Sequence, residues 1–422
     1  MISGESELHW SRPALMYLYM REFTLKEATP YPMSWFQQKG IELKHDWVSA
    51  IQRDQKYVHL ASGDTLSYDR LLLALGSEPK PLQLSSDHCP DLPHPRIFGM
   101  YGLNDLERLQ KLTPHLKRVT IVGSGLIGVE LAEMMLHEGV TVDLISRSPA
   151  FSSHLLAPEE AQLITDRLRK AGVRLWLEEE INEIIDLTSQ EETQRSKGQL
   201  RVSLKGGAQL ESDLLLIAIG VTPAISKLKG IEDLCDRGLQ IDECMKTRDP
   251  HLFAAGDCAE RRHPLPPSSW RSISGSWYEA QMMGREAAYH IFKSLGGSRA
   301  NEASTKPVFA PSPWYQSSSF LGIEYHEYGT CFSMDHSIPQ DTSSLFWSSS
   351  DRICTLRVWH HNERVIGICC LGLRLYQPVC ARWIKEFHGL KEVVSTLLDA
   401  RFEPEFDHDL THARDFLQDL IS

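Results

Sequence analysis

The chain has 422 residues, of which 42% are hydrophobic and 24% charged, and its formal net charge is -12 at pH 7. This composition is that of an ordinary globular protein, and the length exceeds the size at which a single hydrophobic core stops growing, so two or three domains are expected. The negative charge excludes DNA and RNA as expected partners, because nucleic-acid binders need clustered lysine and arginine.

The sequence contains neither a predicted transmembrane segment nor a secretion signal. No run of about 18 apolar residues exists, and Met1 is not followed by a basic and then an apolar stretch. The nine cysteines are odd in number and irregularly spaced, so they do not indicate a disulfide framework. This agrees with a reducing compartment, and we expect a cytoplasmic protein.

Two apolar segments of similar design end in a glycine. Residues 68–76, YDRLLLALG, include Ala74 and end at Gly76, and residues 212–220, SDLLLIAIG, end at Gly220. Continuous apolar runs of this length are typical of strands that are buried on both faces of a parallel sheet. We therefore predict two such strands, one on each side of the central part of the chain.

A dinucleotide-binding βαβ unit is predicted between these two strands. Residues 119–122 form its first strand, a helix follows and ends at Gly139, and residues 141–146 form its second strand. The turn between the first strand and the helix has the G-x-G-x-x-G spacing, which is formed by Gly123, Gly125 and Gly128.

The three glycines of this turn have separate roles. The first permits the tight turn, the second lets the backbone approach a pyrophosphate, and the third lets helix and strand pack closely. The phosphates would lie at the N-terminus of the helix, where backbone N–H groups and the helix dipole favour an anion. We predict a nicotinamide dinucleotide here, and the alternative is a βαβ unit without a ligand.

The end of the second strand bears on the choice between NAD and NADP. An Asp or Glu normally stands there and hydrogen-bonds the 2′-hydroxyl of the NAD ribose. This chain has Ser146 followed by Arg147, and an arginine can pair with the 2′-phosphate of NADP. NADP is therefore favoured over NAD, and the alternative is an arginine that only faces solvent.

Two further elements follow the second glycine-terminated strand. Residues 239–259 place an apolar strand ahead of Gly256 and Asp257, and residues 278–295 predict a helix that carries Gln281. From about residue 305 the chain changes to short strands followed by helices.

The C-terminal part contains a predicted hairpin and few signs of metal binding. Residues 353–359 and 364–371 are its two strands, and within the second strand Cys369 and Cys370 are expected to point to opposite faces. Residues 407–412 include two histidines at an i, i+4 spacing but no third ligand set by spacing, so no metal site is predicted.

Together these segments resemble the pyridine-nucleotide-disulfide oxidoreductase superfamily, the FAD- and NAD(P)-dependent reductases, over residues 9–420. The resemblance implies an α/β fold with two Rossmann-like dinucleotide-binding domains and a C-terminal α+β interface domain. The FAD domain would comprise residues 1–105 and 236–304, the NAD(P) domain residues 106–235, and the interface domain residues 305–422. In that family the last domain often mediates dimerisation, so a homodimer is a candidate assembly.

The resemblance also implies roles for individual residues. Asp257 would hydrogen-bond the ribityl chain of FAD, Gly256 would let the backbone come close, and Glu130 would lie near the nicotinamide and flavin rings. Arg12 and Pro13, in SRPALM, match a segment that runs beside the flavin, where related reductases often carry a lysine in place of Tyr17. The remaining residues expected to bind a cofactor on this resemblance are Ala74, Gly76, Gly220 and Gln281.

One departure from the family concerns the front of the FAD domain. Complete members begin with a strand, a Gly-rich turn and a helix for the ADP half of FAD, and this unit is not found ahead of Arg12. In a sheet of order 3-2-1-4-5 its strand is the central one, so residues 71–75 and 252–255 are expected to lack the neighbour that pairs their backbone. Either the chain is incomplete at its N-terminus, another segment or chain fills the gap, or the flavin domain has decayed.

The expected function is that of an FAD-dependent NAD(P)H oxidoreductase. Hydride would pass from the nicotinamide to the flavin, and electrons would pass on to an acceptor such as a ferredoxin, a rubredoxin, a quinone or a small oxidant. The chemistry is that of the cofactors, so no catalytic side chain is named. The alternative is a flavin-free, nicotinamide-binding regulatory or assembly protein derived from such a reductase.

Overall fold

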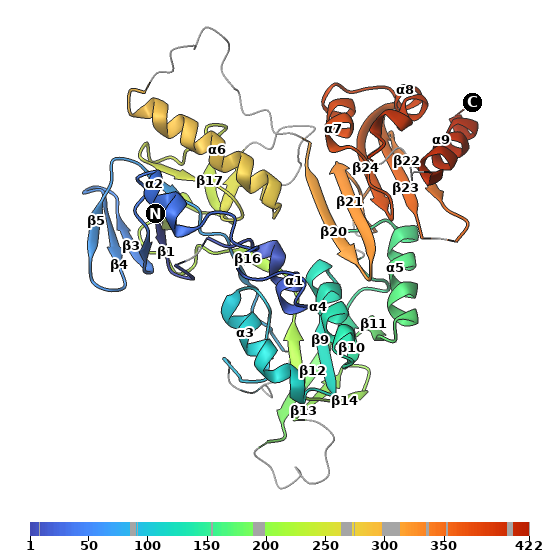
Figure 1. The fold of residues 1–422 in the computed structure, drawn as a ribbon, viewed down its shortest axis with the longest axis horizontal. Coiled ribbons are helices and arrows are strands. Elements are labelled where there is room, and N and C mark those ends of the chain that lie inside the picture. Colours follow the sequence, from blue (N-terminus) through green and yellow to red (C-terminus); the bar gives the residue numbers. More distant parts are fainter. Residues whose placement is uncertain are drawn as a thin grey trace.

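The fold was analysed in a computed structural model. It describes residues 1–7, 9–84, 90, 92–152, 155–188, 199–262, 272–273, 275–297, 313–334, 337–351, 353–402 and 408–421. Three parts can be distinguished in Figure 1: a discontinuous part built from the N-terminal residues and residues 239–294, a central part, and a C-terminal part.

The central part contains a five-stranded parallel sheet of order β11-β10-β9-β15-β8. Its middle strands are largely buried, and Val119, Ile121 and Leu215 have no exposed surface. The elements of this sheet and of the helices around it are β8 (Ile97–Phe98), α3 (Leu103–Leu112), η2 (Thr113–His115), β9 (Arg118–Val122), α4 (Leu126–His137), β10 (Thr141–Ser146), α5 (Pro158–Lys170), β11 (Arg174–Leu177) and β15 (Leu214–Ile217).

A small antiparallel sheet extends this central part. It has the order β12-β13-β14 and consists of β12 (Ile181–Asp186), β13 (Leu200–Leu204) and β14 (Gln209–Ser212).

The predicted βαβ unit is confirmed, because β9, α4 and β10 follow one another and the two strands pair in parallel. Gly139 follows the helix with a φ of +73°.

The discontinuous part brings together segments that lie far apart in the sequence. Strand β6 (Leu71–Leu73) pairs in parallel with β18 (Leu252–Ala254), and β7 (Ser77–Pro79) pairs with β16 (Val221–Pro223). Its other elements are β1 (Ile2–Ser3), η1 (Arg12–Ala14), α1 (Leu15–Tyr19), α2 (Met33–Gln38), β2 (Lys44–His45), β3 (Val48–Gln52), β4 (Tyr57–Leu60), β5 (Thr65–Ser67), η4 (Glu232–Leu234), β17 (Leu239–Ile241), β19 (Ala259–Arg261) and α6 (Trp277–Ser294).

Two expectations about this part need correction. Strands β6 and β18 do not both lack a neighbour, because they pair with each other, and among the described residues no further strand pairs with the second edge of either one. Along β6 only Leu73 is buried, and Ala74 beyond it is exposed, so the predicted burial on both faces is wrong there. In addition, β8 joins the central sheet, although we assigned residues 97–98 to the flavin domain.

The C-terminal part is an antiparallel sheet of order β20-β21-β24-β23-β22 with helices on one face. The predicted hairpin is confirmed as β23 and β24. Cys369 packs in the hydrophobic cluster that includes the central part, and Cys370 packs in the cluster that includes the C-terminal helices. The two side chains therefore face opposite sides of the sheet, as expected. The elements are β20 (Tyr315–Phe320), β21 (Ile323–Gly329), β22 (Thr342–Ser348), β23 (Thr355–His361), β24 (Arg364–Leu371), α7 (Gln377–Lys385), α8 (Leu390–Ser395), η5 (Leu397–Ala400) and α9 (His408–Ile421).

The hydrophobic core connects the parts of the molecule. One hydrophobic cluster runs continuously from α1 through the central part into the C-terminal sheet, so these parts are packed against each other.

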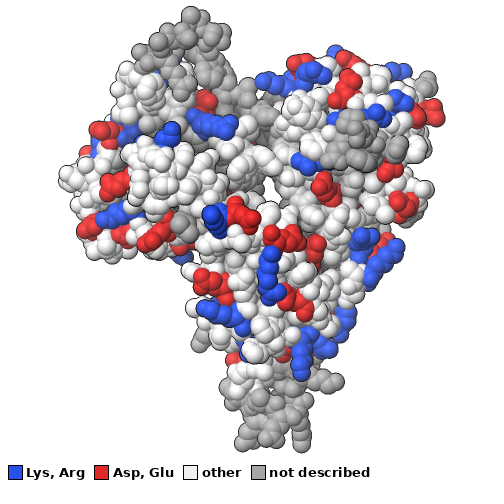
Figure 2. All heavy atoms as spheres, viewed as in Figure 1, with Lys and Arg blue, Asp and Glu red and all other residues white. Residues whose placement is uncertain are grey.

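The charged side chains on the surface are mixed in sign. Figure 2 shows acidic and basic side chains interspersed over the face it draws. No helix in the described ranges is long and apolar enough to cross a membrane.

Candidate cofactor-binding site

The Gly-rich turn after β9 has two glycines that the protein itself requires. Gly123 has a φ of +109°, and a Cβ there would collide with the carbonyl of Ala218. A Cβ on Gly128 would collide with the carbonyl oxygen of Gly123. These contacts agree with the roles predicted for the first and third glycines, the tight turn and the close packing of the helix.

The N-terminus of α4 is open to a ligand. Gly125 is its N-cap residue, with φ -82° and ψ -174°, and no side chain caps the helix by a hydrogen bond. The N–H groups of the first turn have no partner within the helix, so they and the helix dipole suit a phosphate. The turn therefore fits the pyrophosphate of a dinucleotide.

At the end of β10, Ser146 and Arg147 differ in exposure. The hydroxyl oxygen of Ser146 is buried, lies 2.6 Å from that of Ser124 and accepts a hydrogen bond from the backbone N–H of Ser148 at 3.1 Å. Ser146 thus ties the Gly-rich turn to β10, and its hydroxyl is already engaged. Arg147 is exposed, and no residue of the described chain forms an ion pair with it.

The two glycine-terminated strands meet beside this turn. Gly76 and Gly220 both have positive φ values, +70° and +95°. The backbone of Lys80 donates to the carbonyl of Gly220 at 3.0 Å, and that of Ala224 donates to Gly76 at 3.1 Å. The structure therefore brings together the ends of the two predicted glycine-terminated segments.

The segment around Asp257 lies against the residues that follow β6. Ser77 donates its hydroxyl hydrogen to Asp257 Oδ2 at 3.0 Å, and Gly256, with a φ of +78°, faces Ala280 in the first turn of α6. Burial raises the pKa of Asp257, while the Ser77 hydrogen bond and the charge of Arg12 act in the opposite direction. Exposed Ala74 leaves this cluster accessible.

Arg12 is placed by a residue that the sequence analysis missed. Its guanidinium pairs with Glu5 at 2.5 Å, donates to the carbonyl of Tyr101 and lies 5.1 Å from the centre of the Trp10 ring. Glu5 lies two residues after strand β1, and an acid just after a strand and ahead of Arg12 could have signalled it. The described residues thus fit the ring and ribityl end of a flavin, and residues 1–11 contain a single glycine, Gly4.

Pro13 and Gln281 are not drawn into these contacts. Pro13 begins η1 and Gln281 lies on α6, and both are exposed. Their predicted roles stay predictions.

Side chains that could hold a metal ion are not clustered in the part of the chain that the structure describes. No three His, Cys, Asp or Glu side chains of these described residues are grouped to hold one. Asp407 lies outside the described residues.

Glu130 connects the nucleotide-binding helix to the C-terminal sheet. Ser318, on β20, donates to Glu130 Oε1 at 3.0 Å, and the backbone N–H of Leu321 donates to Glu133 Oε2, one turn further along α4, at 2.9 Å. Burial raises the pKa of Glu130 to about 7, opposed by the Ser318 hydrogen bond and reinforced by the charge of Glu133. Tyr17 lies near enough that the charge of Glu130 raises its pKa, after burial as the main cause.

This raised pKa predicts a pH-dependent stability. The folded protein holds the proton of Glu130 up to about pH 7, whereas the unfolded chain releases it near pH 4.5, so the free energy of unfolding should fall as pH rises between these values. The fall should reach about 2–3 kcal/mol, and Glu130→Gln should remove it. Thermal unfolding from pH 5 to 8 measures this, with Asp166→Asn on the surface of α5 as control. An unaltered pH dependence in Glu130→Gln would contradict it.

Comparison with known proteins identifies the family. Residues 2–284 match the family model described as pyridine nucleotide-disulphide oxidoreductase, so the chain belongs to this family of oxidoreductases, whose cofactors are FAD and NAD(P)H. The assimilatory nitrate reductase electron transfer subunit of Bacillus subtilis (strain 168) is 28% identical over 261 residues, which are 62% of this chain. The chain covers only 32% of that protein.

Solved structures share the fold over nearly the whole chain. A ferredoxin reductase from Rhodopseudomonas palustris has a TM-score of 0.71 at 22% identity, with 98% of this chain and 92% of that chain covered. An engineered water-forming NADPH oxidase, derived from a Lactobacillus brevis enzyme, has a TM-score of 0.79 at 17% identity, with 100% and 92% covered. At these identities the likeness shows the fold, which confirms the predicted α/β class.

Proposed function

We propose that the chain is an NADPH-dependent flavoprotein reductase that passes electrons to a small acceptor protein. The observation that carries this proposal is the uncapped N-terminus of α4 at Gly125, and the hydrogen-bonded pair of Ser77 and Asp257 supports it. The relative from Bacillus subtilis is an electron transfer subunit and the Rhodopseudomonas protein is a ferredoxin reductase, which favours a protein acceptor. A small oxidant is the other candidate.

The residues of this chain would bind and orient the cofactors. The turn at Gly125 would hold the pyrophosphate of NADPH, Arg147 its 2′-phosphate, and Asp257 the ribityl chain of FAD, while Glu130 would border the two rings. When bound, FAD accepts a hydride from NADPH and returns its two electrons one at a time to a one-electron acceptor. The protein's contribution is to place the two rings together and to limit access to them.

The direct test is a nucleotide and flavin assay on the purified 422-residue chain. We expect NADPH to reduce ferricyanide, a one-electron acceptor, only when FAD is present, with two ferricyanide ions reduced for each NADPH oxidised. Absence of turnover at saturating FAD, with NADPH binding intact, would overturn the reductase proposal.

The open edge of β6 favours a second candidate function. Strands β1 and β2 form one pair and β6 and β18 another, and no strand of the described chain joins the two pairs. This arrangement suits a nicotinamide-binding regulatory or assembly protein that uses no flavin. Visible absorbance of the chain mixed with FAD and then desalted separates the two functions, because only the reductase should retain a flavin spectrum.

The preference for NADPH is argued from Arg147. The engineered NADPH oxidase carries the replacement of a consecutive Asp-Ala-Met run by Ala-Arg-Ser and was solved with NADPH, whereas the parent enzyme was solved with NADH. This chain has Ser146, Arg147 and Ser148 at the end of β10, likewise without an acid and with a central arginine. The exposed, unpaired guanidinium supports a charge-assisted contact with a 2′-phosphate.

We therefore expect Arg147→Ala to weaken NADPH binding about 10- to 100-fold, because a hydrogen bond to a charged group contributes about 1.5–3 kcal/mol. NADH binding should change by no more than about threefold, since NADH has no group for the arginine to pair with. Titration of both nucleotides by fluorescence measures this, with Arg169→Ala as a surface control. Equal affinities for NADPH and NADH in the unmutated chain would refute the preference.

A further inference from the structure

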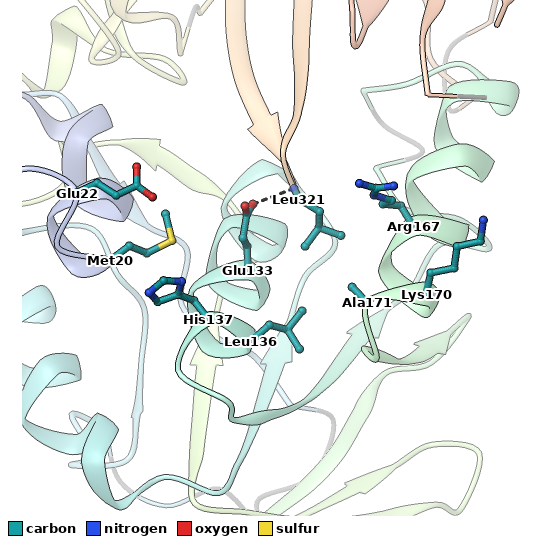
Figure 3. A pocket seen from close by; sticks show the side chains of 9 residues that line it. All are labelled: Met20, Glu22, Glu133, Leu136, His137, Arg167, Lys170, Ala171 and Leu321. Atoms are coloured by element: carbon teal, nitrogen blue, oxygen red, sulfur yellow. Dashed lines mark hydrogen bonds between the residues drawn. The ribbon is translucent and has the colours of Figure 1, made fainter. Parts of the chain in front are cut away.

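A cavity of about 590 Å³ lies where the three parts of the molecule meet. Figure 3 shows that its lining side chains come from the end of α1 and the turn after it, the second half of α4, the end of α5 and the turn between β20 and β21. Its volume is within the range of small-molecule binding sites. The lining residues are Met20, Glu22, Glu133, Leu136, His137, Arg167, Lys170, Ala171 and Leu321.

This cavity does not include the Gly-rich turn, and Glu133, its lining residue nearest the cofactor site on α4, lies one turn beyond Glu130. The residues that α4 contributes, from Glu133 to His137, lie in its last turns, whereas Gly125 caps its opposite end. A helix rises about 1.5 Å per residue, so Glu133 and His137 lie roughly 12 Å and 18 Å along α4 from Gly125. A ligand in the cavity would not contact the Gly-rich turn.

One wall of the cavity is basic. Arg167 and Lys170 are three residues apart on α5 and therefore share one face of the helix. No described residue forms a hydrogen bond or an ion pair with either side chain. Arg169, between them, instead pairs with Asp166 at 3.1 Å and does not line the cavity. The helix dipole favours basic residues in the last turn of any helix. It does not explain why Arg167 and Lys170, the two without a partner among the described residues, both line the cavity.

The rest of the cavity combines apolar side chains with two acidic ones, Glu22 and Glu133, and with His137. Leu136, Leu321 and Ala171 supply apolar surface. In Figure 3, Glu133 lies between these apolar residues and Glu22. Glu133 already accepts a hydrogen bond from the Leu321 backbone, and burial raises its pKa. Figure 3 shows Glu22 on the side of the cavity opposite Arg167 and Lys170, so an anionic head group would meet its attractive partners at the α5 wall and apolar contacts beside it.

We propose that this cavity binds a small organic carboxylate, whose head group pairs with Arg167 and Lys170 and whose apolar body packs against Leu136 and Leu321. This site is additional to the cofactor site and does not rest on the proposed reductase function. Because the lining residues come from all three parts, an occupant stabilises their mutual arrangement. Binding should therefore raise the unfolding temperature of the protein.

Three probes with the same eight-carbon body test the proposal: octanoate, octanol and octylamine. Isothermal titration with the full chain should show octanoate binding at least tenfold more tightly than octanol, with octylamine the weakest. The double variant Arg167→Ala with Lys170→Ala should weaken octanoate at least tenfold and leave octanol unchanged. Arg169→Ala is the matched control on the same helix and should bind octanoate as the unmutated chain does.

A variant that fills the space checks the location of the site. Ala171 is exposed at the C-terminal end of α5, so Ala171→Trp should fold normally, block octanoate binding and leave NADPH affinity within about twofold. Equal affinity for octanoate and octanol, or octanoate binding that survives both the double variant and Ala171→Trp, would overturn the proposal. A parallel loss of NADPH binding in these variants would also overturn it, because the two sites would then not be separate.

Discussion

Replacing Arg357 with methionine should lower the unfolding temperature by roughly 5–15 °C, the largest loss of stability that we expect from a single substitution away from the cofactor site. Arg357, on β23, pairs with Glu160 on α5 through two hydrogen bonds, from Nε to Oε1 at 2.8 Å and from Nη2 to Oε2 at 3.0 Å. The Arg357 side chain is 7% exposed and that of Glu160 is 0% exposed. The pair joins the central part to the C-terminal sheet.

The size of this effect follows from the cost of a buried, unpaired charge. Removing one partner of a buried ion pair typically costs about 3–5 kcal/mol, because the other charge stays desolvated without its counterion. Arg357 also donates to Ser344 Oγ at 2.9 Å and lies 4.4 Å from the centre of the Phe346 ring, so its replacement removes these contacts as well. Glu159, which also contacts Arg357, is half-exposed and is affected less.

A second variant separates charge from shape in this test. The double variant Arg357→Met with Glu160→Leu should recover most of the lost unfolding temperature, because an apolar replacement of both partners is often neutral. Arg169→Ala, which breaks an exposed pair, should change the stability by less than about 1 kcal/mol. An unfolding temperature that stays unchanged in Arg357→Met alone would show that the pair does not join the two parts.

Local pattern explains why much of the fold could be predicted from the sequence. Strands β9 and β15 are runs of buried apolar residues, and the turn between β9 and α4 depends on Gly123 and Gly128, whose requirement for glycine is visible in the motif itself. The hairpin of β23 and β24 likewise depends on neighbours in the chain. Such elements form from short-range information, so sequence patterns predict their existence and type.

Contacts between distant residues could not be predicted in this way. Ser318 and Glu130 are 188 residues apart, and Arg357 and Glu160 are 197 residues apart, so neither pair leaves a trace in local spacing. The boundary near residue 105 was misplaced for the same reason, because β8 has only two residues and is recognisable only by its pairing with β15. The pairing of β6 with β18 was also missed, although both strands were predicted.

The position of Ser146 in the motif predicted where this residue lies, but not which hydrogen bonds its hydroxyl makes. Its place at the end of β10 predicted a cofactor ligand, and its position there is as expected. The structure adds that its hydroxyl is shared with Ser124 and the backbone of Ser148, which makes it a link between the turn and β10. A side chain's available hydrogen-bonding capacity depends on its neighbours in space, which sequence spacing does not report.

Replacing Gly125 with valine should weaken NADPH binding at least 100-fold while leaving the fold intact. Gly125 has φ -82° and ψ -174°, an extended conformation that any residue adopts, so the backbone does not require glycine there. Gly123 and Gly128 differ, because a Cβ on either one collides with a backbone carbonyl. The backbone conformation at position 125 does not require glycine, so the close approach of a ligand is the reason that we propose for it.

The comparison of two variants makes this prediction decisive. Gly125→Val should shift the unfolding temperature by only a few degrees, since valine in place of glycine at an N-cap costs about 1 kcal/mol or less. Gly128→Ala should destabilise the protein by about 1–3 kcal/mol through overpacking against Gly123, even in the absence of nucleotide. Calorimetric titration with NADPH and thermal unfolding without it measure the two effects separately. If Gly125→Val bound NADPH as tightly as the unmutated chain, the uncapped end of α4 would not be the nucleotide site.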